Sequence, residues 1–142
     1  MANRRYTQFC ERLAACWMAD DLDAVADFYS HPLAIYTGNT VRIELNRQDT
    51  IDSIAMRITS SRAAGAAKIV PELTDVSQSE DGRAILHINW QYLDSTDQVI
   101  SQSVLRYYCR ESQAGEIKIE MVEFEAFAYP SATGNPPKRR DH

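Results

Sequence analysis

The hydrophobic period of this chain changes once, at about Lys68, and this change restricts the fold more than any other feature. Before it, apolar residues recur every three to four positions, as on the buried face of a helix. After it, apolar and polar residues alternate, as in strands that bury one face. Helices followed by hairpin-linked strands predict an α+β fold with a mostly antiparallel sheet.

Two helices are predicted before the first proline. The first carries one apolar stripe at helical spacing, made of Tyr6, Phe9, Cys10, Leu13 and Trp17. The second is shorter, with Asp20 or Asp21 as its cap, and its apolar residues continue to Tyr29. We expect His31-Pro32 to end it, because the residue before a proline is pushed out of the helical region.

A hairpin and a third helix follow. Residues 33–45 contain two β-prone runs around a turn at 38–40 that includes Gly-Asn. The third helix is expected over 47–64, with Asn46 or Asp49 as its N-terminal cap. Three helices are therefore expected to precede the main part of the sheet.

Four longer strands are predicted next, near Lys68–Val76, Arg83–Asp94, Val99–Glu111 and Glu116–Ala128. Alternation in the middle two assigns one face to Ala84, Leu86, Ile88, Trp90, Tyr92, Ser103, Leu105, Tyr107 and Cys109. In the last strand the apolar phase slips between Met121 and Val122, which predicts a β-bulge and a bend in the sheet.

Composition limits the class of protein and its partners. A chain of 142 residues with 44% hydrophobic residues fits one globular domain. The net charge of −5 has the wrong sign for a nucleic-acid groove. Cys10, Cys16 and Cys109 show no metal or redox spacing and are expected to be reduced. With no apolar N-terminal segment and no apolar run of roughly 18 residues, we expect a cytoplasmic protein without membrane contact.

The last residues differ from the rest. From Pro130 the chain contains three prolines and no apolar periodicity, and it carries the basic run Lys138-Arg139-Arg140. We expect residues 1–129 to form the domain and residues 130–142 to be a disordered tail.

Four short motifs, taken in order, resemble the nuclear transport factor 2-like superfamily. They are the acidic turn at 19–29, Leu33-Ala34-Ile35-Tyr36, residues 46–51, and Leu105-Arg106-Tyr107 followed by Gly115-Glu116-Ile117. The resemblance covers residues 6–128. It implies a cystatin-like cone, in which a strongly curved sheet holds three helices in its concave face. It also suggests a SnoaL-like protein, and members of the superfamily often pair through the outer face of the sheet.

That superfamily contains cofactor-free isomerases, dehydratases, polyketide cyclases and epoxide hydrolases, and also transport adaptors, so the fold leaves the function open. When the chain is aligned with the ketosteroid isomerases of this superfamily, the positions of their three catalytic residues fall on Leu13, Thr37 and Ser103. None of these side chains can supply a base with a tunable pKa. We therefore expect that isomerase mechanism to be absent.

The inward faces predict an apolar, aromatic interior cavity that contains neutral hydroxyls and no ionisable group. Such walls suit a small apolar or aromatic molecule. The candidate ligand-binding residues are Trp17, Thr37, Trp90, Tyr92, Ser103 and Tyr107. For these residues the alternative is plain core packing or a hydroxyl that is satisfied within the sheet.

His31 is the main candidate for acid-base catalysis, with Tyr29 as its proton partner, because the pKa of imidazole lies near neutrality. A structural or exposed role for His31 is the alternative. His87 is expected on the outer face and His142 in the tail. We expect no metal and no cofactor, because ligand spacings and glycine-rich phosphate loops are both missing.

Three functions stay open from the sequence. The chain is a small-molecule-binding domain, a cofactor-free isomerase, dehydratase or cyclase, or a dimeric interaction domain without a ligand. A homodimer through the outer sheet face is expected, because that face mixes opposite charges with a few apolar residues.

Overall fold

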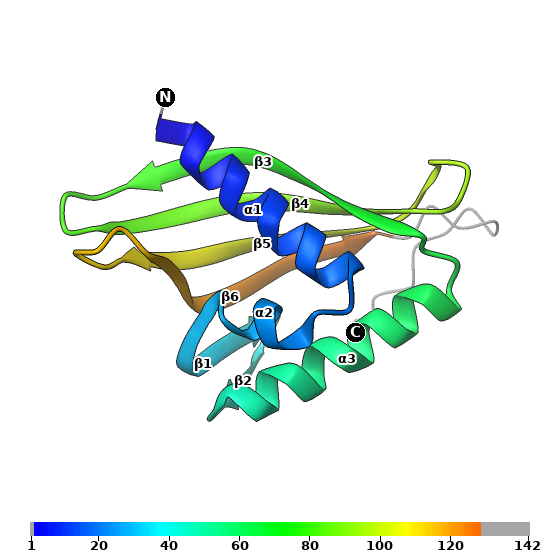
Figure 1. Ribbon diagram of the computed structural model, residues 1–142, viewed down its shortest axis with the longest axis horizontal. Coiled ribbons are helices and arrows are strands. Elements are labelled where there is room, and N and C mark those ends of the chain that lie inside the picture. The colour runs from blue at the N-terminus through cyan, green and yellow to red at the C-terminus, as the bar shows by residue number, and fades with distance from the viewer. Residues whose placement is uncertain (1, 129–142) are drawn as a thin grey trace.

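The computed structural model describes residues 2–128 and has the predicted α+β architecture (Figure 1). The described helices are α1 (Ala2–Met18), α2 (Leu22–Ala26) and α3 (Arg47–Ala63). The strands are β1 (Tyr29–Thr37), β2 (Thr40–Glu44), β3 (Lys68–Gln78), β4 (Arg83–Leu93), β5 (Val99–Glu111) and β6 (Ile117–Ala128). The predicted tail and its basic run lie outside the described residues. No described helix combines the length and the apolar character needed to cross a bilayer.

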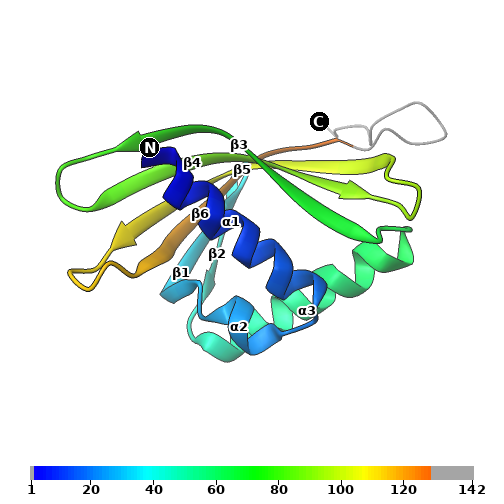
Figure 2. The ribbon, with the colours of Figure 1, turned by 45° about the horizontal axis from the view of Figure 1, so that its top comes forward.

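The strands form one six-stranded sheet in the order β2-β1-β6-β5-β4-β3. Neighbours are antiparallel except β1 and β6, which run parallel. No tight turn joins β1 to β6, so their relative direction is free of the constraint that makes hairpins antiparallel. Figure 2 shows the sheet curving over the helices, which all lie on its concave side. The predicted curved, mostly antiparallel sheet is confirmed.

A bulge in β6 contributes to this curvature. Cys109 of β5 is opposite Ile119, whereas the preceding Tyr108 is opposite Met121, so Glu120 is an extra residue in β6. The bulge moves the apolar phase by one position and places both Ile119 and Val122 in the core. The slip predicted from the sequence is therefore confirmed, one residue before the predicted point.

The core lies between α1 and the concave face of the sheet. The predicted apolar stripe of α1 is buried in full, from Tyr6 to Trp17. On the sheet side, Leu86 and Ile88 are completely inaccessible to solvent. The phenyl rings of Phe9 and Phe28 lie 5.1 Å apart between their centroids, which joins α1 to the chain that follows α2. Helix and strand periods together thus identified this core correctly.

The predicted end of the second helix is wrong. Helix α2 stops at Ala26, and Tyr29 already belongs to β1. The amide of Ile119 in β6 donates to the carbonyl of Phe28 at 2.8 Å, so the chain is already paired with the sheet directly before Tyr29. At the other end, the Asp21 carboxylate accepts from the amide of Ala24 and is the cap. Four apolar residues at helical spacing were too few to separate a helix from a helix followed by a strand.

Candidate functional site

A groove of about 870 Å³ lies between α3 and the sheet, and we call it the α3 groove. Its helix wall includes Ser53, Met56, Arg57 and Ser60. Its sheet wall includes Thr37, Tyr92, Ile100 and Phe124. Small serines on the helix leave room opposite the aromatic side chains of the sheet. The groove therefore has space for an organic molecule.

A second, inner pocket of about 10 Å³ lies at the deep end of the groove, and the two share Glu44, Ser53, Arg57 and Phe124. Its volume is roughly that needed by one water molecule. The sequence predicted an apolar, aromatic interior cavity, and beside Tyr107 the structure leaves only this small space. Alternation identifies the inward face of a strand but does not give the volume left between inward side chains.

The predicted ligand-binding residues fall into two groups. Thr37 and Tyr92 line the α3 groove, and Tyr107 lines the inner pocket. Trp17, Trp90 and Ser103 are buried in the core behind these walls. They support the walls: the ring of Trp17 lies edge-on to Tyr92 at 6.0 Å, and Trp90 Nε1 donates to the Tyr107 hydroxyl at 3.1 Å.

Two buried phenols bound the inner pocket. The rings of Tyr29 and Tyr107 are perpendicular, with their centroids 6.4 Å apart. Burial raises the pKa of Tyr29, and it raises the pKa of Tyr107 well above its ordinary value, while the positive charge of Arg57 partly offsets both shifts. Both phenols are therefore neutral at physiological pH and able to donate a proton to a hydrogen bond.

The carboxylate of Glu44, in β2, reaches the deep end of the groove and is only 4% exposed. It accepts hydrogen bonds from Thr50 Oγ1 at 2.7 Å and from the Arg42 guanidinium at 3.0 Å. The prediction of a site without ionisable groups is therefore wrong. A signal was available, because Glu44 is opposite the buried Leu33 in the hairpin and must share its inward face.

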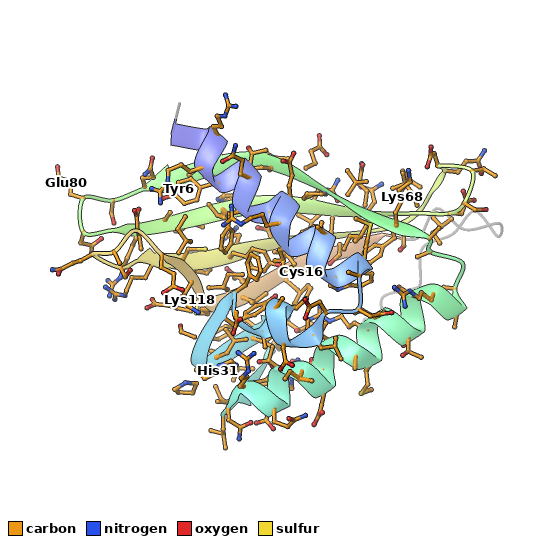
Figure 3. All side chains as sticks on the ribbon, in the orientation of Figure 1. Tyr6, Cys16, His31, Lys68, Glu80 and Lys118 are labelled. Carbon is orange, nitrogen blue, oxygen red and sulfur yellow. The ribbon has the colours of Figure 1, made fainter. Side chains whose placement is uncertain are left out.

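His31 connects to this carboxylate indirectly. Its Nε2 lies 2.6 Å from Thr50 Oγ1. The single hydroxyl proton of Thr50 is donated to Glu44, so Thr50 accepts from His31, and Nε2 must carry a proton. His31 itself lines neither hollow, and Figure 3 shows it at the edge of the molecule beside the start of α3. Of the two predicted acid-base candidates, only Tyr29 borders a pocket.

Arg57 is the second groove residue that the sequence analysis missed. It lies on α3 beside Ile54 and Ile58, the buried residues that identify the apolar face of this helix. It is half-buried, and its guanidinium carbon lies 5.2 Å from the centroid of the Phe124 ring. No pattern along the chain distinguishes Arg57 from the exposed arginines, because its partner Phe124 is far away in the sequence.

The described residues offer no ready metal site. Within residues 2–128 no three His, Cys, Asp or Glu side chains gather closely enough to hold an ion. His87 lies opposite Arg106 on the neighbouring strand, away from the groove. The side chains that offer chemistry at the site include its phenols, its carboxylates and its guanidinium groups.

Comparison with known families shows which family the chain belongs to. A family described as "NTF2-like protein (DUF6841)" matches residues 3–123. The chain belongs to this NTF2-like family. No curated protein matches the chain.

Solved structures agree on the fold of this NTF2-like protein. An NTF-2 like protein of unknown function from Shewanella oneidensis is 14% identical, with a TM-score of 0.69, over 89% of this chain and 100% of the other. ActVI-ORFA from Streptomyces coelicolor is 10% identical, with a TM-score of 0.66, over 87% and 93%. A domain of unknown function with a cystatin-like fold from Nostoc punctiforme is 13% identical, with a TM-score of 0.65, over 86% and 75%. At these identities the similarity shows the fold alone.

Proposed function

We propose that this NTF2-like protein binds a small, largely apolar organic molecule in the α3 groove. The observation that carries the proposal is the shape and chemistry of the groove, a hollow of about 870 Å³ with aromatic and aliphatic walls and a polar deep end. Ligand pockets of roughly 300–1,000 Å³ with mostly apolar walls and a few polar groups are typical of small-molecule sites. The groove has a volume in this range, and most of the accessible surface of its lining is apolar, with five charged side chains among the lining residues.

The walls suggest how the molecule is held. Tyr92, Ile100 and Phe124 offer apolar surface on the sheet side, and Met56 covers it from α3. A flat or extended hydrocarbon body between these side chains removes apolar surface from water on both sides. The charged lining residues come from β2 and from α3 up to Arg57, whereas the polar lining residues beyond them, Ser60, Ser61, Ser101 and Gln102, are neutral. An amphipathic molecule therefore has a preferred direction in the groove.

A neutral fluorophore, N-phenyl-1-naphthylamine, tests the proposal without relying on charge. We expect saturable binding with one molecule per chain, measured by fluorescence and by calorimetry. Ser60→Trp places a large ring in the groove and is expected to weaken binding at least about tenfold, because the ring occupies the space of the ligand.

The neighbouring Thr59→Trp is the matched control. Thr59 is exposed on the same helix and lies outside the groove, so its replacement should leave the affinity unchanged. Equal affinities for the two variants, or no saturable binding to the unmodified protein, would contradict the proposal and favour an interaction domain without a ligand.

A cofactor-free isomerase, dehydratase or cyclase is the second candidate function. It is favoured by the path from His31 through Thr50 to Glu44, which places a proton acceptor at the deep end of the groove. The neutral phenols of Tyr29 and Tyr107 are close enough to the same pocket to donate to a developing oxyanion. This carboxylate takes the place of the bases missing from the ketosteroid isomerase positions.

We also propose a homodimer through the outer sheet face. Tyr36 and Val41 face each other there on β1 and β2, and Val41 is 52% exposed although it is apolar. Val41→Lys is expected to shift the protein from dimer to monomer in light scattering, because it places a charge in the buried contact. Val70→Lys makes the same change on β3, at the opposite edge of the sheet, and should leave the mass unchanged. A monomer before any substitution would exclude the dimer.

A further inference from the structure

Arg57 occupies the point where the α3 groove meets the inner pocket. It lines both hollows and is half-buried between them. Its guanidinium carbon lies over the ring of Phe124. The ring attracts the cation and takes up none of its N–H donors in a hydrogen bond with a carboxylate, so these donors stay available for a ligand.

Within the described residues, Arg57 forms no ion pair with a carboxylate and no hydrogen bond with another side chain. This separates it from the described arginines that do hold a carboxylate, which are Arg5, Arg42, Arg47, Arg62, Arg83, Arg106 and Arg110. Most of those are exposed, where an ion pair contributes little. Three described arginines are half-buried, and of these Arg106 and Arg110 each hold a glutamate whereas Arg57 holds no described carboxylate. A half-buried charge without an anion is costly unless a ligand supplies one.

The carboxylates near Arg57 are already engaged elsewhere. Glu44 accepts from Thr50 and Arg42, the Asp49 carboxylate accepts from the amide of Leu45 at 2.9 Å, and Asp52 accepts from Gln48 at 2.9 Å. None of these three carboxylates forms a described ion pair with Arg57. The guanidinium is therefore the one positive group of the groove whose charge is not already matched by a described partner.

Ser53, one turn before Arg57 on the same face of α3, offers a second donor. Its Oγ accepts a hydrogen bond from Arg42 at 3.3 Å, so its hydroxyl proton stays available to a ligand. Ser53 lines the same two hollows as Arg57. A planar oxyanion at this point can meet the guanidinium fork and a hydroxyl together.

We propose that the ligand of the α3 groove carries a carboxylate, which the guanidinium of Arg57 binds with two parallel hydrogen bonds, while the apolar body of the ligand lies against Phe124, Tyr92 and Ile100. This inference rests on the proposed binding function and adds the chemical class of the ligand. Arg57 is then the residue that selects acids over neutral molecules of the same shape.

Matched pairs of an acid and its amide test the proposal, namely 2-naphthoate with 2-naphthamide and indole-3-acetate with indole-3-acetamide. Calorimetry should show that the unmodified protein binds each acid about 10- to 100-fold more tightly than its amide, as expected for a charge-assisted pair of hydrogen bonds. Arg57→Met keeps the apolar stem over Phe124 and should lower the affinity for the acid to that for the amide. Arg57→Lys keeps the charge without the fork and should give an intermediate preference.

Arg4→Met is the control for net charge, because Arg4 is exposed on α1 and lies outside both hollows. It should leave the preference unchanged. Equal binding of acids and amides to the unmodified protein, or a preference that survives in Arg57→Met, would overturn this inference and leave the binding function standing. If neither the acids, the amides nor the neutral fluorophore bind, the proposed function itself fails. Comparison of acid and amide on the unmodified protein decides the matter even if a variant does not fold.

Discussion

Leu105→Ala is expected to lower the free energy of unfolding by about 2–5 kcal/mol, the usual range for removing a fully packed leucine. Leu105 is 2% exposed at the centre of the concave face and borders the inner pocket beside Tyr107 and Val122. Urea unfolding at neutral pH measures the loss. The neighbours of Leu105 are held on a continuous sheet, so we expect them to close only part of the space that the side chain leaves.

The control is Val104→Ala, the adjacent position on β5 whose side chain lies on the outer face and is half-buried. Its cost should stay below about 1 kcal/mol, because little packed volume is lost. The void in Leu105→Ala is apolar and joins the inner pocket, so saturating benzene should restore part of the loss in this variant alone. Similar losses for the two variants would show that the sheet does not have the assigned inward and outward faces.

Thr50→Val is expected to cost about 2–4 kcal/mol, although it preserves shape. The Thr50 hydroxyl is buried, accepts from His31 and donates to Glu44, so its removal leaves a charged oxygen and an imidazole N–H without their partner. Urea unfolding measures the effect. Thr50→Ser, which keeps the hydroxyl, should recover most of the stability, and Thr59→Val on the exposed side of α3 should change it by less than about 0.5 kcal/mol.

Exchange of substrate protons separates the two candidate functions. If Glu44 acts as a base on a bound carbonyl compound, the protein should catalyse exchange of the α-protons of such compounds for deuterium, followed by NMR in heavy water. Glu44→Gln should abolish the exchange, and Thr50→Val should reduce it by more than its loss of stability explains. Absence of exchange in the unmodified protein across ketones and β-keto acids would remove the enzymatic alternative and leave the binding function.

The strands and two of the helices were predictable because their period extends over many residues. Burial alternates along β4 from Arg83 to Trp90 and along β5 from Gln102 to Arg110, and the apolar stripe of α1 extends over about three turns. Short elements gave less information. The end of α2 was misplaced because only four apolar residues supported it, and the competing contact was a hydrogen bond to Ile119, some ninety positions along the chain.

Local patterns likewise identified some residues of the site and missed others. Thr37 and Tyr92 were placed on the correct face, and both line the groove. Glu44 was missed although the register of the β1–β2 hairpin marks it as inward. The inward assignment of Leu33 was not extended to Glu44, the residue paired with it on the neighbouring strand. Arg57 could not have been found, because its position at the groove depends on the packing of α3 against β6.

The order of residues alone determined the period of the long elements, the inward faces of β4 and β5 and the bulge in β6, since these depend on neighbours within a few positions. Only the tertiary structure decided where space was left. Volume depends on how side chains from distant segments meet, and beside Tyr107 the structure leaves only a small space. The open space lies instead in the α3 groove, where Glu44 and Arg57 supply charges. The register of the hairpin marks Glu44 as inward, but no local pattern marks Arg57.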